Sequence, residues 1–331
     1  SHHWKDIPLT REVDTLNMPI QLENFTSGVA VNVGNPHIVF FGKKIPVEGE
    51  TILGNNFVIG PGGKGSNQAV AAAKAGVKTY FISKIGDDQF GSMARKIYEE
   101  AGVDYSKVII SSEHSTGAAG IFVDQQSGKN AINVVAGAAG ALTTDDIDQA
   151  ADVIKNSQVF LTQLEAPKEV VFYALKIAKE NNVTTVLNPA PATLIDKEIF
   201  PLIDYFTPNE TEAGFYVNHK VEDEEDAKKA SDKLLQLGIK NIIITLGEKG
   251  AFFANDRENF HVPVVDLNNP VLDTTGAGDA FNGGFAVALT ENEKYNIKDA
   301  IKFASATAGL STTKIGTANS MPSRDEIDKL L

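Results

Sequence analysis

The sequence predicts an α/β fold in which a doubly wound, mostly parallel sheet carries a small β-sheet lid. From about residue 145 onward, short apolar runs alternate with helical patterns of roughly 10–15 residues. Such alternation is typical of parallel strands connected by helices. Further short strands near residues 38–60 and 118–135 interrupt the alternation, and we expect them to form the lid.

In the first part of the chain, strands are predicted where apolar residues alternate or run together, at residues 28–33, 57–60, 79–85, 118–123 and 130–135. The polar residues 124–129 separate the last two segments, which together predict a hairpin. A helix is predicted at residues 66–76, which are rich in alanine and end at Gly76.

In the second part, five short apolar segments predict strands, at residues 159–164, 183–187, 205–207, 241–245 and 250–254. Helices are expected between them, for example at residues 169–181 and 224–237. Ligands of such sheets bind outside the carboxyl ends of the strands. The loops that follow these strands are therefore the expected location of a site.

Composition and charge exclude several classes of protein. The 331 residues suffice for one large domain, and we expect an N-terminal extension at residues 1–27 and one α/β domain at 28–331. The net charge of −13 argues against nucleic acid or an anionic membrane as the main partner. No apolar run approaches the roughly 20 residues of a membrane helix. The absence of cysteine excludes disulfides and thiolate catalysis and fits a cytoplasmic location, and the six histidines show no metal-ligand spacing.

The strongest candidate for chemistry is the segment DTTGAGD at residues 273–279, which an apolar helix follows. Its small residues Gly276, Ala277 and Gly278 allow backbone N–H groups to converge on an anion at a helix N-terminus. Asp279 would repel a phosphate held there. It could instead take a proton from an incoming hydroxyl while the amides hold the moving phosphoryl group. The alternative is that Asp279 only caps the helix.

A second glycine-rich segment, GPGGKGSN at residues 60–67, lies between a strand and a helix. It is not a Walker A loop, because glycine rather than Ser or Thr follows Lys64. Its backbone and Asn67 could approach a polyhydroxy ligand, or the segment could be a plain tight turn. It also matches G-x-G-x-x-G from Gly60, with the acidic Asp87 further on, so a dinucleotide site stays open.

Two weaker segments, TPNETE at residues 207–212 and TLGEKG at 245–250, also follow predicted strands. That is the edge of the sheet where a nucleotide would bind. Taken alone, each is more typical of an ordinary cap or turn.

Together these segments resemble the ribokinase branch of the PfkB carbohydrate kinases, from about Lys43 to the C-terminus. The resemblance rests on the order and spacing of Gly49-Glu50-Thr51, residues 62–69 (GGKGSNQA), Gly86-Asp87-Asp88, Leu164-Glu165, and residues 207–212 and 273–279. It implies a ribokinase-like α/β domain with a small β lid, and a homodimer formed through that lid.

The resemblance also implies roles for individual residues. The sugar pocket would be lined by Asn35, His37, Gly63, Lys64, Asn67 and Glu165, with Asp279 as the base. The nucleotide would lie along Asn209, Glu212, Thr245, Gly247, Gly250 and Ser305. The anion hole would consist of Gly276, Ala277 and Gly278. An activating K⁺ would bind near Asp273, Thr275, Gly316 and Ser320.

The start of the chain departs from this family. Members of the family begin with a strand that is followed by an Asn-x-Asp motif, and the Asp of this motif binds the sugar hydroxyls. Residues 35–37 are Asn-Pro-His, so His37 stands at the position of the acid. Residues 4–42 instead resemble a fragment of diaminopimelate epimerase, through Trp4, residues 14–17 (DTLN) and residues 31–37 (VNVGNPH). The fragment is too short, and lacks the cysteine, for racemisation. We expect residues 29–33 to supply the family's first strand and residues 1–22 to pack peripherally.

The resemblance implies transfer of a phosphoryl group from ATP to a pentose, giving D-ribose 5-phosphate and ADP from D-ribose. Mg²⁺ would bridge the phosphates and neutralise developing charge. The expected partners are a small sugar and ATP, with no nucleic acid and no membrane. Because His37 replaces an acid, a kinase of another sugar or nucleoside and a non-catalytic sugar- or nucleotide-binding protein remain alternatives.

Overall fold

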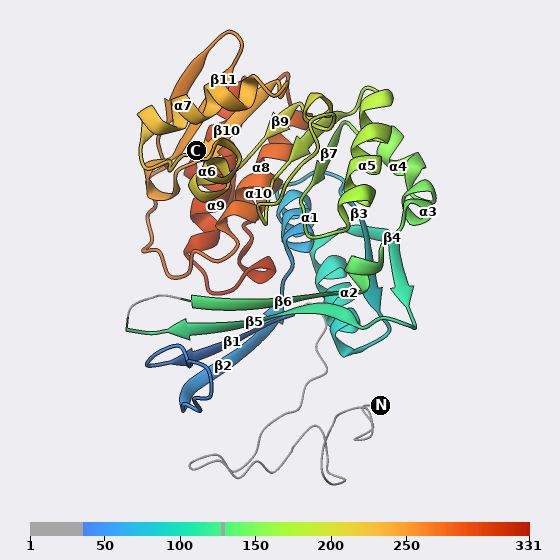
Figure 1. The fold of residues 1–331 in the computed structure, drawn as a ribbon, viewed down its shortest axis with the longest axis vertical. Coiled ribbons are helices and arrows are strands. Elements are labelled where there is room, and N and C mark those ends of the chain that lie inside the picture. The colour runs from blue at the N-terminus through green and yellow to red at the C-terminus, as the bar shows by residue number, and fades with distance from the viewer. Residues whose placement is uncertain (1–35, 127–129) are drawn as a thin grey trace.

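The computed structural model describes residues 36–126 and 130–331. These residues form a body of helices packed around mostly parallel strands, and a small sheet that projects from one end of the body (Figure 1).

Six strands form the main sheet of the body, in the order β12-β11-β10-β9-β8-β7. Four of them pair in parallel: β7 (Val159–Thr162), β8 (Thr184–Leu187), β9 (Tyr205–Phe206) and β10 (Asn241–Thr245). The antiparallel strands β11 (Ala251–Asn255) and β12 (Asn259–Val262) complete the sheet.

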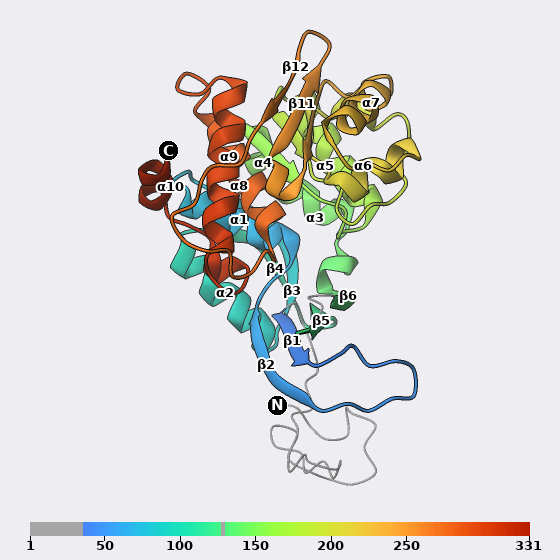
Figure 2. The same ribbon diagram turned by 90° about the vertical axis from the view of Figure 1, so that its left-hand side faces the viewer.

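Helices cover both faces of the main sheet, which makes it doubly wound (Figure 2). One face packs against α5 (Lys168–Glu180), α6 (Glu210–Val217) and α7 (Glu224–Leu235), and the other against α8 (Ala277–Thr290) and α9 (Ile297–Thr312). Successive side chains of a strand point to opposite faces. Accordingly, Ile242 and Ile244 lie in the first of these two core clusters and Ile243 lies in the second.

A two-stranded parallel sheet of β3 (Tyr80–Gly86) and β4 (Asp104–Ser111) lies beside the main sheet but does not pair with it. The remaining helices pack around these two sheets. They are α1 (Lys64–Lys74), α2 (Gln89–Ala101), α3 (Thr144–Asp148), α4 (Ala151–Lys155) and α10 (Arg324–Leu330), with short 3₁₀ turns at Ala138–Ala141, Phe200–Leu202, Gly247–Lys249 and Ala318–Ser320.

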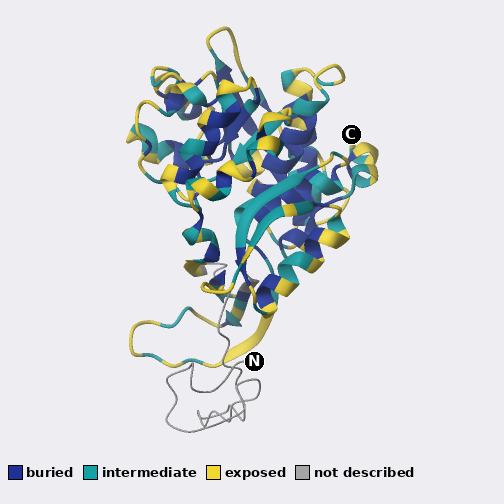
Figure 3. Cartoon of the chain, turned by 90° about the vertical axis from the view of Figure 1, so that its right-hand side faces the viewer, coloured by how far each residue is buried: buried dark blue, intermediate teal, exposed yellow. Residues whose placement is uncertain are grey.

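The small sheet has the order β2-β1-β5-β6, built from β1 (Pro36–Gly42), β2 (Gly54–Pro61), β5 (Thr116–Asp124) and β6 (Asn130–Gly137). Its β1 is antiparallel to β2 and parallel to β5. Buried residues concentrate in the body, whereas much of the small sheet is exposed (Figure 3). On one of its faces Phe40 stacks on Phe57 and on Phe122, with ring centroids 6.2 and 5.2 Å apart.

The predicted fold class is confirmed, including the small sheet at the two places where the alternation breaks. Strands β4 and β12 were not predicted, because β4 opens with polar residues and β12 (Asn-Phe-His-Val) has no apolar run. The predicted strand at residues 28–33 lies outside the described residues, as do the extension at 1–27 and most of the epimerase-like segment. Within the described ranges no helix is long and apolar enough to cross a membrane.

Candidate active site

Asp279 lies in the first turn of α8, buried to 8% exposure. It does not cap the helix: the N-cap is Gly276, and no side chain makes a capping hydrogen bond there. Instead the Asp279 carboxylate accepts hydrogen bonds from Asn67 Nδ2 at 2.8 Å and from Gln68 Nε2 at 3.1 Å. The capping interpretation of this residue is therefore wrong.

Burial gives Asp279 the titration range of a general base. Removal of the carboxylate from water raises its pKa to about 6, although the nearby positive charge of Lys64 and the two amide hydrogen bonds act in the opposite direction. A base works best when its pKa lies near the pH at which it operates. Asp279 is thus ionised at neutral pH and still basic enough to accept a proton.

The glycine-rich segment brings α1 to Asp279. Residue 64 begins α1, and Asn67 and Gln68 follow in its first turns, both buried to 1% exposure. Close packing of α1 on α8 makes this possible: a Cβ on Gly283 would lie 2.5 Å from Ala71 Cβ. Glycine at position 283 therefore permits the approach of the two helices.

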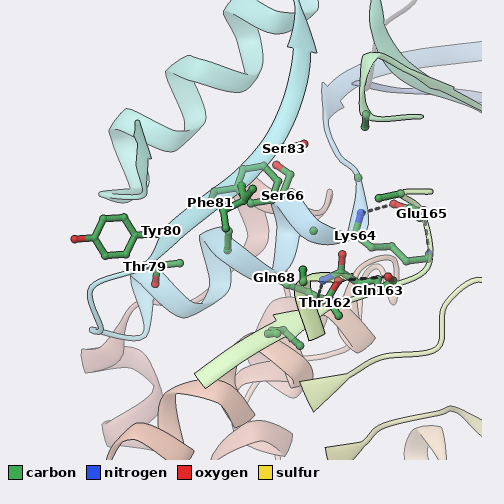
Figure 4. Close-up of a pocket in the computed structure, with 18 of the residues that line it drawn as sticks. Lys64, Ser66, Gln68, Thr79, Tyr80, Phe81, Ser83, Thr162, Gln163 and Glu165 are labelled. Carbon is green, nitrogen blue, oxygen red and sulfur yellow. Dashed lines mark hydrogen bonds and ion pairs between the residues drawn. The ribbon is translucent and has the colours of Figure 1, made fainter. Parts of the chain in front are cut away.

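Lys64 and Glu165 form the rim of the same site (Figure 4). The backbone N–H of Lys64 donates to Glu165 Oε2 at 3.0 Å, and its ammonium lies 3.8 Å from Glu165 Oε1. Both side chains are about one-third exposed, so they stand where a ligand could reach them. Gly63 precedes Lys64 with a φ of 92° and is the N-cap of α1.

A chain of hydrogen-bonded amide and hydroxyl side chains, most of them buried, leads away from Asp279 through Gln68. Gln68 accepts a hydrogen bond from Gln163 and donates to Asn188 Oδ1 at 3.2 Å. Asn188 in turn donates to the carbonyl of Thr207 at 3.0 Å. Thr207 donates to Asn282 Oδ1 at 2.6 Å, and Asn282 donates to the carbonyl of Gly278 at 2.8 Å. These bonds connect the ends of β7, β8 and β9 with the first turn of α8.

The predicted anion hole lies where α8 begins. Gly276 adopts a left-handed φ of 81°, and Ala277 and Gly278 are the first two residues of the helix. The first N–H groups of a helix have no partner within it and attract an anion. The N–H of Ala277 is partly engaged, because it donates to the carbonyl of Thr274 at 3.2 Å.

Two predicted nucleotide residues, Asn209 and Glu212, bind each other. Asn209 is the N-cap of α6 and accepts from the N–H of Glu212 at 2.8 Å, while Glu212 Oε2 accepts from the N–H of Asn209 at 2.9 Å. Burial raises the pKa of Glu212. The sequence alternative of an ordinary cap is thus what these two side chains form in the structure.

The other predicted nucleotide residues lie on nearby elements. Thr245 ends β10 and bridges to Asn209, and Gly247 and Gly250 flank the turn that follows. Ser305 lies half-buried on α9, the helix packed against α8.

Three of the four predicted potassium residues meet at Asp273. Its carboxylate accepts from the N–H of Thr275 at 2.9 Å and from the N–H of Gly316 at 3.0 Å. Ser320 is buried and donates to the carbonyl of Thr317 at 2.6 Å. Oxygen ligands are what a hard cation requires, and the Asp273 carboxylate is one such group. No group of three His, Cys, Asp or Glu in the described part of the chain could hold a metal ion.

Two predicted substrate residues are not placed. Asn35 lies outside the described residues, and only the backbone of His37 is described, within β1.

The structure does not support a dinucleotide site at the segment that begins at Gly60. The preceding strand, β2, is antiparallel to β1 in the small sheet, whereas a dinucleotide site needs a parallel βαβ unit.

Sequence reasoning missed the side chains of this hydrogen-bonded chain, of which Gln68 contacts Asp279 directly: Gln68, Gln163, Asn188, Thr207 and Asn282. Gln68 and Asn188 are 120 residues apart, and Thr207 and Asn282 are 75 residues apart. Gln68, Thr207 and Asn282 lie within or beside the motifs already singled out, and this was the signal that could have found them.

Comparison with known proteins identifies relatives of this chain. A family model described as "pfkB family carbohydrate kinase" matches residues 35–324. A ribokinase of Haemophilus influenzae is 41% identical over 278 residues, covering 84% of this chain and 89% of the relative. A deoxyribokinase of Salmonella typhi is 37% identical over 295 residues, covering 89% and 95%.

A solved structure shows the same architecture. The structure of Arabidopsis thaliana ribokinase complexed with ribose and ATP superimposes with a TM-score of 0.82 at 30% identity, covering 89% of this chain and 95% of that one. The family match covers nearly the whole described chain and includes every segment of the candidate active site that the structure places. The chain therefore belongs to the pfkB family of carbohydrate kinases and is an ATP-dependent sugar kinase with a ribokinase-like fold.

Proposed function

We propose that this protein phosphorylates D-ribose with ATP and forms D-ribose 5-phosphate and ADP. The observation that carries the proposal is the buried Asp279, held by two amides of α1 at the N-terminus of α8. A base placed beside an anion-binding helix terminus suits phosphoryl transfer to a hydroxyl. Relatives at 41% and 30% identity that are ribokinases support the choice of ribose.

In this mechanism Asp279 accepts the proton of the sugar 5-hydroxyl as its oxygen attacks the γ-phosphorus of ATP. Asn67 and Gln68 fix the orientation of the carboxylate, so that its free electron pair faces the hydroxyl. The amides of Gly276, Ala277 and Gly278 hold the equatorial oxygens of the moving phosphoryl group, where negative charge is greatest. The proton moves to Asp279 and the electron pair of the broken P–O bond leaves with ADP.

The sugar pocket has a free acceptor for a hydroxyl. Asn67 Oδ1 is buried without a hydrogen-bond partner. A buried polar atom of this kind costs stability unless something pairs with it. We assign a sugar hydroxyl to Asn67 Oδ1, and further hydroxyls to the exposed parts of Lys64 and Glu165. Gly63, Asn35 and His37 complete the proposed pocket.

The nucleotide is assigned to the loops after β9 and β10, with Asn209, Glu212, Thr245, Gly247, Gly250 and Ser305 along it. Mg²⁺ would be held mostly by substrate phosphates and water, with one or two carboxylates. Bound there, Mg²⁺ neutralises charge on the phosphates. Glu212, buried and near the anion hole, is the carboxylate we assign to its hydration shell.

A potassium ion is assigned to the loop around Asp273, with Thr275 and the backbone near Gly316 and Ser320. The Asp273 carboxylate already ties residue 275 to residue 316. A cation bound by both segments would further connect residues 273–278, which end in the anion hole, with the segment that contains Gly316 and Ser320.

We further propose a homodimer that forms through the small sheet, in the cytoplasm. The support is the exposed apolar surface on one face of that sheet, where Phe40 is 39%, Phe57 51% and Val135 56% exposed. Burial of such a patch stabilises association. Light scattering of the protein and of a Phe40→Ser/Phe57→Ser variant tests this: the variant should be monomeric.

The experiment that tests the activity is a coupled ADP-release assay with a panel of acceptors: D-ribose, 2-deoxy-D-ribose, D-fructose and adenosine. The highest kcat/KM is expected for D-ribose. The deoxyribokinase relative makes 2-deoxy-D-ribose the matched competitor. If another acceptor gives a higher kcat/KM, that acceptor and not ribose is the substrate. If no acceptor causes release of ADP, the alternative of a non-catalytic binding protein is favoured.

A further inference from the structure

Asn188 is a buried amide residue directly after β8, at the edge of the main sheet where the candidate active site lies. Its backbone N–H donates to the carbonyl of Thr162 at 2.9 Å, which continues the parallel ladder between β7 and β8 by one residue. Because side chains of a strand alternate between faces, Asn188 shares the face of Val186. Val186 belongs to the same core cluster as Phe281 of α8. The amide of Asn188 therefore lies on the side of the sheet that α8 covers.

Two hydrogen bonds fix the orientation of the Asn188 amide. Its Nδ2 donates to the carbonyl of Thr207 at 3.0 Å, and its Oδ1 accepts from Gln68 Nε2 at 3.2 Å. A backbone carbonyl can only accept, so the NH₂ end of Asn188 has to face Thr207. The oxygen end of Asn188 then has to face Gln68. A backbone group at the end of β9 thus determines which end of its amide Gln68 presents.

Gln68 transmits this polarity to Asp279. The Nε2 of Gln68 carries two hydrogens, of which one goes to Asn188 Oδ1 and the other to Asp279 Oδ1 at 3.1 Å. Its Oε1 accepts from Gln163 Nε2 (Figure 4). Both hydrogens and the oxygen of the amide are therefore engaged. Gln68 is 1% exposed, so bulk water does not compete for these bonds.

The same bonds oppose a reversed orientation of the Gln68 amide. If Gln68 turned its oxygen toward Asp279, that oxygen would also face Asn188 Oδ1, and two acceptors would meet. If Asn188 turned over as well, its oxygen would face the carbonyl of Thr207. Either reversal leaves buried acceptors opposed with no hydrogen between them, which is costly. Gln68 therefore presents a donor to Asp279, and a protonated Asp279 finds no acceptor there for its hydrogen.

We propose that Asn188 is a positioning residue that keeps Asp279 in its ionised form. It acts through Gln68, because it holds the NH₂ end of the Gln68 amide toward the carboxylate. A hydrogen bond donated to a carboxylate favours the ionised form over the protonated form. The inference deepens the proposed function and rests on the assignment of Asp279 as the base.

Other groups also face Asp279 and set the balance between its two forms. Burial raises the pKa of Asp279 to about 6, and the negative charge of Glu165 acts in the same direction. The positive charge of Lys64 and the amide of Asn67 lower this pKa. Burial, and to a smaller degree the charge of Asp279, raises the pKa of Glu212 on α6. These groups are a constant background for the variants that follow.

Asn188→Leu keeps the approximate shape of the side chain and removes both hydrogen bonds of the amide. Gln68 is then free to turn over, and the pKa of Asp279 should rise by about one unit or more, as expected when a hydrogen bond to a charged group is lost. The acid limb of kcat/KM for ribose should move to higher pH by the same amount. Activity should therefore fall about tenfold at about pH 5 but much less at about pH 8. An equal loss at every pH would show a merely structural role and would overturn the proposal.

Asn241 offers a matched control with the same two kinds of hydrogen bond. Its Nδ2 donates to the carbonyl of Asp204 at 2.9 Å, and its Oδ1 accepts from Asn255 Nδ2 at 3.3 Å. Asn241 begins β10, whereas the candidate active site lies at the carboxyl ends of the strands. Asn241→Leu should lose stability in urea and leave the acid limb in place. A shift in this control as large as that in Asn188→Leu would contradict the assignment.

A double variant tests whether Asn188 acts through Gln68. Gln68→Leu removes the direct bond to Asp279 and should by itself move the acid limb to higher pH. Addition of Asn188→Leu to this variant should cause no further shift, because the connecting amide is already gone. A further shift of similar size would overturn the proposal. If Asn188→Leu does not fold, Asn188→Ala provides the same comparisons, and an unchanged acid limb in that variant would equally contradict the role of Asn188.

A titration that does not use activity separates this inference from the proposed function. In protein labelled with ¹³C at the Asp carboxyl carbons, the resonance of Asp279 is the one that Asp279→Asn lacks. Its midpoint should lie at about pH 6 in the unchanged protein and about one unit higher in Asn188→Leu. Equal midpoints would overturn the positioning role of Asn188. A raised midpoint together with near-normal turnover of Asp279→Asn would support that role and contradict only the assignment of Asp279 as the base.

Discussion

The side-chain amide of Asn67 donates a 2.8 Å hydrogen bond to the carboxylate of Asp279, although 212 residues separate the two in the chain. Asn67 belongs to the glycine-rich segment that begins α1, and Asp279 to the first turn of α8. One contact thus joins the two strongest sequence motifs into one site and fixes the orientation of the proposed base.

The first prediction concerns Asp279 as a base. Asp279→Asn keeps the shape of the side chain and removes its basicity, so kcat should fall by about 10²–10⁴. ATP affinity, measured by calorimetry, should change little. Near-normal turnover of the folded variant would contradict the role.

The second prediction is the pH dependence of that base. Burial raises the pKa of Asp279 to about 6, and only the ionised carboxylate can accept a proton. The kcat/KM for ribose should therefore be level above about pH 7 and fall by about tenfold per pH unit well below 6, since this parameter reports the free enzyme. An inflection near pH 4, typical of an exposed Asp, would show that burial does not control this step.

Much of the fold could be predicted, because its strands carry distinct apolar runs. Strand β10 was predicted at its observed bounds, Asn241–Thr245, and all three of its central isoleucines are buried. Strand β4 begins Asp-Tyr-Ser-Lys and has no apolar run over its first half. Its position depends on tertiary pairing with β3, which local sequence does not reveal.

Some residues of the candidate active site could likewise be predicted from the sequence, and others could not. Asp279, Lys64 and Asn67 could be predicted because they lie in glycine-rich segments whose local geometry suggests an anion or a polyol. Asn188 could not, because its amide side chain carries no distinctive pattern and its hydrogen bond to Gln68 spans 120 residues. Asn209 and Glu212 show the converse: a motif proposed for the nucleotide also forms the cap of α6.

The third prediction concerns the contact of α1 with α8. In Gly283→Ala the new Cβ would lie 2.5 Å from Ala71 Cβ and 2.8 Å from the carbonyl oxygen of Gln68. Overpacking of this kind costs about 1–3 kcal/mol, and the displaced α1 would pull Asn67 away from Asp279. Urea denaturation measures the loss of stability. Gly278→Ala is the matched control for stability, because nothing lies within 4 Å of its Cβ; equal stability of the two variants would contradict the close approach.

The fourth prediction concerns the proposed potassium loop. Activity should be higher in K⁺ than in tetramethylammonium at equal ionic strength, because the cation would stabilise the segment that ends in the anion hole. Asp273→Asn should weaken this activation, since it removes the charge that accepts from the N–H groups of Thr275 and Gly316. Equal rates in the two cations would contradict the proposed potassium site.

The last prediction concerns His37, which stands where the family has an acid. Its backbone begins the small sheet next to Gly60 and Ala119, at the end of β1 that lies beside the glycine-rich segment. A neutral imidazole has one acceptor nitrogen, whereas a carboxylate can accept from two sugar hydroxyls. His37→Asp should therefore lower the KM for ribose, by an amount that corresponds to one or two hydrogen bonds to a charged group, about 1.5–3 kcal/mol each. His37→Asn is the matched control, because it offers one acceptor oxygen without the charge and should improve KM less. If His37→Asp leaves the KM for ribose unchanged or raises it, either residue 37 does not face the sugar or ribose is not the substrate, and the acceptor panel decides between these two explanations.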